Sequence, residues 1–256
     1  MREGVSMPDE VAKANQGATT TKYEFFVYIV ESPSAPDLYH GRSEGGLVAQ
    51  AIGLDLIPCV VRTAINSEAF GAALKIGLPE AMKQCPGRYP ILHLSAHGGK
   101  DGVQLSNGEI ITWAQLREFL VPVNESLQGS LLLCMSACEG YGACRMAMEV
   151  RDAPHPYFAM IGNFGTPSWS DTAVSYLAFY HLLAKGWKIR DAVEAMKAAA
   201  CDLQWVVQTA DEIKQGYLEF MKERAVPVQA QRELETVGQD ARLSPSAKAL
   251  ESGERG

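Results

Sequence analysis

The sequence predicts an α/β protein, in which a mostly parallel β-sheet lies between two layers of helices. Short runs of consecutive apolar residues predict strands that are buried on both faces, as the strands of parallel sheets are. Segments with apolar residues at helical spacing alternate with these runs, and that alternation is typical of parallel strands joined by right-handed crossovers. The chain has 256 residues, of which 47% are hydrophobic and 21% are charged, and this composition supports one sizeable core.

Four apolar runs are expected to form the strands of this sheet. The three clearest runs lie at 23–30, 90–96 and 129–136, and a weaker candidate covers 57–62. Two of the clear runs lead into reactive side chains with adjacent glycines. The run at 90–96 ends at His97-Gly98-Gly99, and the run at 129–136 is soon followed by Cys138-Glu139-Gly140.

Helices are expected between and after these strands. Asn66 or Ser67 is suited to begin the first helix and Thr112 the second, because such side chains accept hydrogen bonds from the first free backbone N–H groups. The expected segments are 67–82, 112–120, 171–185 and 189–224. The residues expected to face the core are Phe70, Leu74 and Leu78 in the first segment, Trp113, Leu116 and Leu120 in the second, and Val174, Leu177, Ala178 and Leu182 in the third.

The two ends of the chain differ in composition from its middle. The N-terminal end mixes charges with Gly, Ala and Thr and lacks the apolar stretch of a signal peptide. The C-terminal end is rich in Gln, Glu, Ser and Gly and has few large apolar side chains. We therefore expect a flexible N-terminal segment over 1–21, a folded domain over 22–225 and a flexible tail over 226–256.

Charge and cysteine content narrow the classes of function. A formal net charge of -7 and a pI near 5.3 argue against direct binding of nucleic acid, whose backbone favours a basic surface. No apolar run is long enough for a membrane-spanning helix. The six cysteines form no C-x-x-C pair, which disfavours a structural zinc site. We therefore expect a cytoplasmic protein with reduced thiols, no metal and no cofactor.

His97 and Cys138 are the candidate catalytic residues. The carboxyl ends of parallel strands meet at one edge of a sheet, so residues that follow two such strands are expected to lie near each other. A thiol nucleophile needs partial exposure and a neighbouring base, and an imidazole can carry a proton between the thiol and a leaving amine. The adjacent glycines let a substrate backbone approach and offer N–H groups to an oxyanion.

Two motifs resemble those of the caspase-like cysteine peptidases. They are His-Leu-Ser-Ala-His-Gly at 93–98 and Ser-Ala-Cys-Glu-Gly at 136–140. The resemblance is closer to the CHAT branch, the caspase-like domains related to separase, and it covers roughly residues 23–201. It implies a caspase-like three-layer α/β/α sandwich around a mostly parallel sheet. The further matching segments are a β-unit at 102–105 and 108–111 and two helices at 179–186 and 191–193.

The resemblance also implies a role for each residue of these motifs. Cys138 would attack a peptide carbonyl and His97 would protonate the departing amine. The backbone N–H groups of Gly98 and Cys138 would stabilise the oxyanion. The implied activity is that of a single-chain cysteine endopeptidase that cleaves a protein. Stand-alone bacterial relatives resemble components of defence or cell-death systems, in which a sensor protein releases the protease to cut a partner such as a pore-forming toxin.

The substrate pocket is where the sequence departs from these relatives. Ser136 replaces the glutamine with which caspases help to hold an acidic substrate side chain, although Arg42 can still serve an acidic residue. Trp169 is expected to line the primary specificity pocket. Asp171 either meets a basic substrate side chain or begins the helix that follows, and both interpretations stay open.

Other interpretations account for parts of the sequence. A catalytically silent caspase-like adaptor would bind proteins through the same groove, but loss of a dyad residue would mark that class and both residues are present. A different α/β hydrolase is disfavoured because no G-x-S-x-G motif occurs. A metal site is disfavoured because His93 and His97 would lie about 13 Å apart on a strand. His93, Cys134 and Cys144 are better explained as packing residues, with His93 also able to support the loop by a hydrogen bond.

Overall fold

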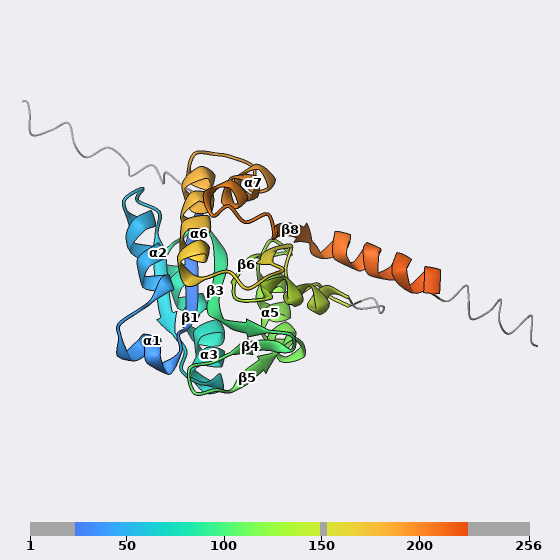
Figure 1. Ribbon diagram of the computed structural model, residues 1–256, viewed down its shortest axis with the longest axis horizontal. Coiled ribbons are helices and arrows are strands. Elements are labelled where there is room, and N and C mark those ends of the chain that lie inside the picture. The colour runs from blue at the N-terminus through green and yellow to red at the C-terminus, as the bar shows by residue number, and fades with distance from the viewer. Residues whose placement is uncertain (1–23, 149–152, 225–256) are drawn as a thin grey trace, which may run out of the picture.

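Six strands form the central sheet in the order β2-β1-β3-β6-β7-β8 (Figure 1). The structure is a computed structural model that describes residues 24–148 and 153–224. Neighbouring strands run parallel except for β8, which pairs antiparallel with β7. The expected mostly parallel sheet is therefore confirmed. The strands are β1 (Phe25–Ser32), β2 (Cys59–Thr63), β3 (Tyr89–Gly99), β6 (Leu132–Ser136), β7 (Ala159–Asn163) and β8 (Trp205–Thr209).

Helices cover both faces of this sheet, so the molecule is a three-layer α/β/α sandwich, as expected (Figure 1). One layer consists of α3 (Ser67–Ala72), α4 (Leu78–Gln84) and α5 (Trp113–Ser126). The other consists of α2 (Glu44–Gly53), α6 (Trp169–Ala184) and α7 (Ile189–Ala199). The short helix α1 (Ala35–Tyr39) lies between β1 and α2, and a hairpin of β4 (Gly102–Gln104) and β5 (Ile110–Thr112) extends from the end of β3.

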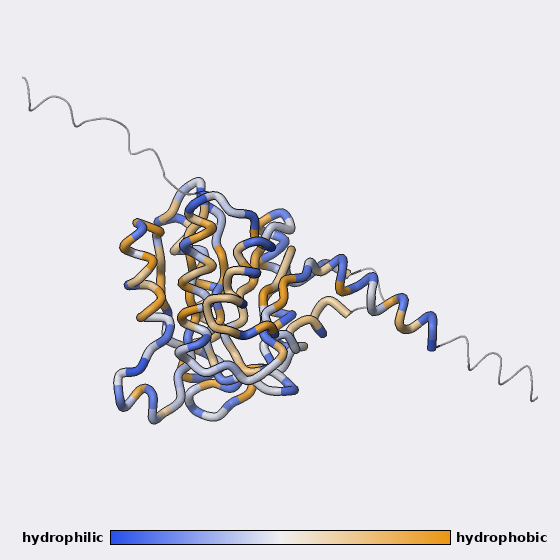
Figure 2. The backbone as a smooth tube through the Cα atoms, turned by 45° about the horizontal axis from the view of Figure 1, so that its top comes forward, coloured by the Kyte–Doolittle hydropathy of each residue, from blue (hydrophilic) through white to orange (hydrophobic). Residues whose placement is uncertain are grey.

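The strands are apolar along their length because each face of the sheet packs against helices. In β1, Phe26, Tyr28 and Val30 belong to the core under α3, α4 and α5. Val27 and Ile29 belong to the core under α2, α6 and α7. All five are buried. Figure 2 shows the same pattern, with hydrophobic residues gathered in the strands and in the parts of the helices that flank them. Burial of this apolar surface is the main favourable term in folding.

Side-chain caps fix where two of the expected helices begin. Asn66, and not Ser67, accepts a hydrogen bond from the Ala69 N–H at the start of α3. Thr112 forms a capping box with Gln115 at the start of α5. The segment after Asn66 is less regular than expected, because a π-helical turn at Ala73–Gly77 separates α3 from α4. The expected core residues of these segments, Phe70, Leu74, Leu78, Trp113, Leu116 and Leu120, are all buried.

The expectation of one helix over 189–224 is wrong in its middle. Helix α7 ends at Ala199, and Cys201 adopts a left-handed backbone with φ 52° that turns the chain. Strand β8 follows, and the chain is helical again only from 210 to 224. The residues of β8 include Trp205 and two valines, which favour strands, and pairing with β7 outweighs the local helical pattern.

Helix α6 buries a different face from the expected one. Val174 has 47% of its surface exposed, and the other residues of the expected stripe, Leu177, Ala178 and Leu182, are only partly buried. The buried residues are Thr172, Ala173, Ser175, Tyr176, Phe179 and Tyr180. The expected stripe counted aliphatic residues, whereas the helix packs its large aromatic rings and its smallest side chains against the sheet.

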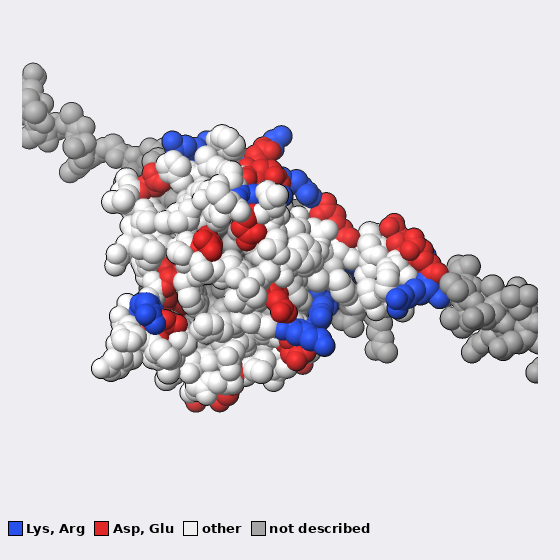
Figure 3. All heavy atoms as spheres, viewed as in Figure 1, with Lys and Arg blue, Asp and Glu red and all other residues white. Residues whose placement is uncertain are grey.

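The expectations for 1–21 and 226–256 lie outside the described residues. Among the helices of the described ranges, none has the length and apolar character needed to cross a bilayer. On the face shown in Figure 3, Lys and Arg occur in small separate groups with Asp and Glu near them. The sign of the charge on this face therefore changes over short distances, and individual pockets set the local electrostatics.

Candidate active site

Strands β3 and β6 bring His97 and Cys138 to the same edge of the sheet. The parallel ladder between these strands ends at the pair Ser95↔Ser136, and each reactive residue follows two positions later in its own segment. Gly98 packs directly against the backbone of Cys138, because a Cβ atom at Gly98 would overlap the Cys138 carbonyl oxygen. The two segments therefore meet at the carboxyl edge of the sheet.

His97 and Cys138 line one cavity of about 220 Å³. Cys138 is partly exposed, and the side chain of His97 has 41% of its surface exposed. The rest of the cavity wall comes from the ends of β3 and β6 and from the chain around the start of α6, including Trp169 and Thr172. A ligand that enters this cavity therefore meets both reactive groups.

A sharp turn after Cys138 sets the position of its backbone. Glu139 adopts the left-handed conformation with φ 50°, which residues with a side chain rarely take. Its N–H donates to the Gly165 carbonyl at 2.7 Å, and the Gly140 N–H donates to the Ala137 carbonyl at 3.0 Å. Within the described residues, no carbonyl accepts a hydrogen bond from the Cys138 N–H. That N–H group interacts instead with the thiol of its own residue.

The Cys138 thiol is protonated at neutral pH. Burial raises its pKa above the usual value, and this outweighs the lowering by the backbone N–H of Cys138 itself, while the nearby Glu139 carboxylate raises the pKa further. Nucleophilic attack by Cys138 consequently requires a base to remove the thiol proton during the reaction.

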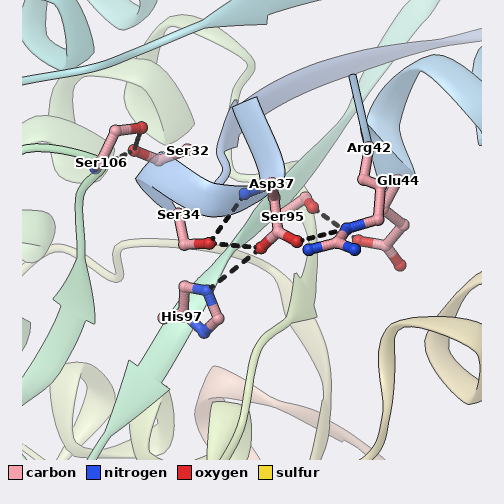
Figure 4. Close-up of polar contacts among 8 residues, drawn as sticks. All are labelled: Ser32, Ser34, Asp37, Arg42, Glu44, Ser95, His97 and Ser106. Atoms are coloured by element: carbon pink, nitrogen blue, oxygen red, sulfur yellow. Dashed lines mark hydrogen bonds and ion pairs between the residues drawn. The ribbon is translucent and has the colours of Figure 1, made fainter. Parts of the chain in front are cut away.

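A carboxylate that the sequence analysis missed lies behind His97 (Figure 4). Asp37 Oδ2, from helix α1, is 3.8 Å from His97 Nε2. The indole of Trp169 meets the His97 ring edge to face, with the ring centroids 5.5 Å apart. The Asp37 carboxylate therefore lies on the Nε2 side of the His97 ring.

Asp37 is itself held by two neighbours (Figure 4). The Ser34 hydroxyl donates to Asp37 Oδ2 at 2.5 Å, and Arg42 Nε donates to Asp37 Oδ1 at 2.8 Å. The hydrogen bond from Ser34 is the main cause that lowers the pKa of Asp37, and the charges of Arg42 and His97 lower it further. Asp37 is therefore a carboxylate at neutral pH. Asp37 follows β1, which pairs with β3, so its position in the sequence could have indicated that it lies near His97.

Three of the expected pocket residues, Trp169, Arg42 and Asp171, do not all line the same cavity. Trp169 lies beside His97 and lines its cavity. Arg42 is bound to Asp37 and lines a second, larger cavity next to the first. Asp171 lines neither of these two cavities, because its carboxylate accepts hydrogen bonds from the N–H and hydroxyl groups of Ser168 in a capping box. Of its two interpretations, beginning the helix is the one that its contacts support.

Ser136 contacts a buried carboxylate that the sequence analysis also missed. Its hydroxyl is buried and donates to Glu44 at 2.7 Å, and the Ser95 hydroxyl donates to the same carboxylate at 2.5 Å. Glu44 is the first residue of α2 and lines the larger cavity. No periodic pattern marks it, because it is the first residue of α2, directly after the irregular chain that follows β1.

His93 is a packing residue, in agreement with the sequence interpretation. It is fully buried, its Nδ1 lies 2.8 Å from the Tyr180 hydroxyl, and the Tyr176 ring meets it edge to face. Burial lowers the pKa of His93 to about 3, so its ring is neutral at physiological pH. Within the described ranges, no three His, Cys, Asp or Glu side chains are grouped in a way that could hold a metal ion.

Comparison with known proteins finds distant structural likeness only. No family model matches the sequence, and no curated protein matches it. The chain is similar to a solved complex of the pro- and mature domains of RgpB from Porphyromonas gingivalis, with 12% identity and a TM-score of 0.47 over 73% of this chain and 47% of that chain. It is also similar to the Arg specific cysteine proteinase gingipain R, with 13% identity and a TM-score of 0.46 over 73% of this chain and 46% of that chain. The chain thus spans about half the length of each.

Proposed function

We propose that this protein is a caspase-like cysteine endopeptidase in which Cys138 is the nucleophile and His97 carries the proton. The observation that supports this most is the shared cavity, where a partly exposed thiol and an imidazole lie at the ends of adjacent strands. A carboxylate behind the imidazole completes the set of groups that thiol-dependent acyl transfer needs.

In the proposed reaction, His97 Nδ1 takes the proton from Cys138 Sγ as the sulfur bonds to the carbonyl carbon of the substrate. The carbonyl oxygen becomes an oxyanion, which the N–H groups of Gly98 and Cys138 stabilise. The C–N bond then breaks, and the leaving amine takes the proton from Nδ1. Water attacks the resulting thioester, gives a proton to His97 and releases the acid, and the sulfur recovers its proton.

Asp37 is a positioning residue in this scheme. Its carboxylate faces Nε2, so it favours the tautomer with the proton on Nε2 and leaves Nδ1 free to act as the base. The same carboxylate stabilises the imidazolium that forms after proton transfer. The raised pKa of the Cys138 thiol makes this assistance necessary, because little thiolate exists before the substrate arrives.

The finer assignment rests on the motifs of the sequence. The H-G and S-A-C motifs with the intervening β-unit resemble the CHAT branch, and on that basis we assign the protein to this branch as a single-chain cytoplasmic enzyme. The same resemblance supports a role in a bacterial defence or cell-death system. There, a sensor or regulatory protein would control cleavage of a protein partner such as a pore-forming toxin.

An active-site probe tests the proposed activity. A peptidyl acyloxymethyl ketone, which alkylates thiols after binding as a peptide, should label wild-type protein at Cys138, as read by mass spectrometry of the digested protein. His97→Ala should abolish this labelling. Cys201→Ala is the matched control, because Cys201 is exposed and distant from the cavity in sequence, and its loss should not affect labelling of Cys138. Labelling confined to other cysteines, or equal labelling of His97→Ala, would favour a silent adaptor.

A further inference from the structure

The larger cavity beside the His97 and Cys138 site has a volume of about 500 Å³. Trp169 lines both cavities, so one indole side chain forms a wall common to the reaction site and to this second space. The other walls come from the chain between β1 and α2, from the start of α2 and from the first turn of α6. A peptide that presents its carbonyl to Cys138 has this cavity beside it.

Glu44 places a buried carboxyl group in the wall of the cavity. Its residue surface is 7% exposed, and the hydroxyls of Ser95 and Ser136 donate to its carboxylate. Within residues 24–148 and 153–224, no Lys, Arg or His nitrogen lies within 4 Å of this carboxylate. The hydroxyl groups satisfy the hydrogen-bonding needs of the Glu44 carboxylate, but they are neutral. An ionised Glu44 therefore has no positive charge beside it.

A second buried carboxylate strengthens this negative potential. Glu31 is 5% exposed and accepts hydrogen bonds from the Ser43 and Thr63 hydroxyls and from the Gly45 N–H, all of which are neutral donors. Burial raises the pKa of Glu44, and the charge of Glu31 raises it further. A cation that enters the cavity would relieve this unfavourable arrangement, because it supplies the missing positive charge.

We propose that the larger cavity receives the substrate side chain that precedes the scissile bond, and that Glu44 selects a lysine or an arginine there. This inference rests on the proposed peptidase function. The apolar side chains of Leu47, Trp169 and Ala173 in the wall suit the methylene stem of such a residue. Its charged end then reaches the Glu44 carboxylate in a charge-assisted hydrogen bond.

Arg42 does not turn this cavity into a site for acidic side chains. Its Nε is 2.8 Å from Asp37 Oδ1, so Asp37 offsets its charge, and 63% of its side chain is exposed to solvent. An acidic substrate side chain deep in the cavity would meet the like charge of Glu44, with no buried cation to compensate. The interpretation of Arg42 as the specificity residue is therefore less favourable than that of Glu44.

The test uses peptide mixtures that differ only in the residue before the scissile bond. That residue is fixed in turn as Arg, Lys, citrulline, Met or Asp, and the other positions are randomised. Citrulline has nearly the shape of arginine without its charge, so it isolates the electrostatic contribution. Wild-type protein should cleave the Arg or Lys mixture at least about 100-fold faster than the citrulline mixture, as expected for loss of a buried ion pair.

Two variants assign this preference to Glu44. Glu44→Gln should reduce the Arg-to-citrulline ratio at least about tenfold. Glu118→Gln is the matched control, because Glu118 is exposed on α5 in the opposite helical layer, and the ratio should not change. Thermal unfolding of both variants should give Tm values close to that of the wild type, which checks that they are folded.

A second measurement does not depend on peptide cleavage. The small cation benzamidine should protect Cys138 of wild-type protein from the acyloxymethyl ketone, and this protection should be lost in Glu44→Gln. The assignment of the cavity would be wrong if the protein prefers Asp or Met. It would also be wrong if both the preference for Arg and the protection by benzamidine persist in Glu44→Gln. Either result would leave the peptidase proposal intact. If the probe never labels Cys138 and no mixture is cleaved, the proposed function itself fails.

Discussion

The protein contains two histidine–cysteine pairs, four residues apart along β3 and along β6 with the turn that follows it. In the ladder between β3 and β6, His93 lies directly opposite Cys134, and His97 and Cys138 follow beyond the end of that ladder. The inner pair is fully buried beneath α6. The outer pair lines an open cavity. Residue type and strand geometry are therefore similar in the two pairs, and access distinguishes them.

Burial makes the inner pair unreactive. It lowers the pKa of His93 to about 3 and raises the pKa of Cys134 to about 12, so both side chains stay neutral under physiological conditions. The Tyr180 hydroxyl occupies His93 Nδ1, the ring nitrogen that the outer histidine keeps for proton transfer. The outer pair has Asp37 behind its imidazole and a cavity in front of it. The position beyond the end of the strand, where a cavity gives access, therefore distinguishes the outer pair from the buried inner pair.

The largest expected effect comes from removal of either member of the outer pair. Cys138→Ala and His97→Ala should each lower the turnover of a cleaved peptide at least about 1,000-fold, because each removes a group that takes part in bond formation. Cys134→Ala is the matched change in the inner pair and should retain at least about half of the wild-type turnover. Equal losses of turnover in the two pairs would show that access to the cavity does not make the outer pair different from the inner pair.

The contact between the strand ends is the next point of difference. Gly98→Ala should lower turnover at least about 100-fold and lower Tm, because the added Cβ overlaps the Cys138 carbonyl oxygen and separates the two segments. Gly99→Ala is the control, since a Cβ at Gly99 has nothing within 4 Å. Turnover assays and thermal unfolding of both variants measure the effect. Tolerance of alanine at Gly98 would show that close backbone contact is not required.

The carboxylate behind His97 has a smaller expected effect. Asp37→Asn should lower kcat about 10- to 100-fold with little change in KM, because the amide neither selects the tautomer nor stabilises the imidazolium. Asp37→Glu should restore part of the activity. Asp211, an exposed residue that pairs with His155 at the surface, provides the control variant Asp211→Asn. If Asp37→Asn matches this control, then proximity to His97 has no catalytic value.

The smallest effect concerns stability and belongs to the inner pair. Because the folded-state pKa of His93 lies below its unfolded value, the unfolded chain binds more protons as the pH falls below about 6.5. The free energy of unfolding should therefore fall by up to about 1.4 kcal/mol for each pH unit as the pH is lowered from 6 to 4, because of His93. Urea unfolding at both pH values should show a shallower loss for His93→Gln than for wild type. Parallel curves would mean that His93 is not buried as a neutral ring.

The sheet and the outer pair could be predicted from the sequence because both depend on local patterns. Continuous apolar runs marked β1, β3 and β6, and the glycines after His97 and near Cys138 marked their ends. Strand β8 could not be predicted in this way, because its pairing with β7 depends on residues far apart in the chain. The short run of β8 is identified as a strand only once its pairing with β7 is known.

The acidic residues of the site were harder to predict for a different reason. Asp37 lies in the five-residue helix α1 and Glu44 is the first residue of α2, and neither position belongs to a periodic stretch long enough to relate the residue to its place in space. Asp171 illustrates the reverse case, since its sequence position pointed equally to a pocket and to a helix cap, and its contacts are those of a cap. Such residues are assigned by three-dimensional contacts alone.

The main-chain ladder between β3 and β6 separates two properties of the site. Adjacent strands lie about 4.8 Å apart whatever side chains they carry, so the ladder fixes how closely the segments that lead to His97 and Cys138 approach each other. Glu44 and Trp169, by contrast, begin helices that loops join to the sheet. Under the proposed function, the strand ends hold the groups that break a bond and the helix starts hold the residue that chooses a target, so related chains could differ in what they cut while keeping how they cut it.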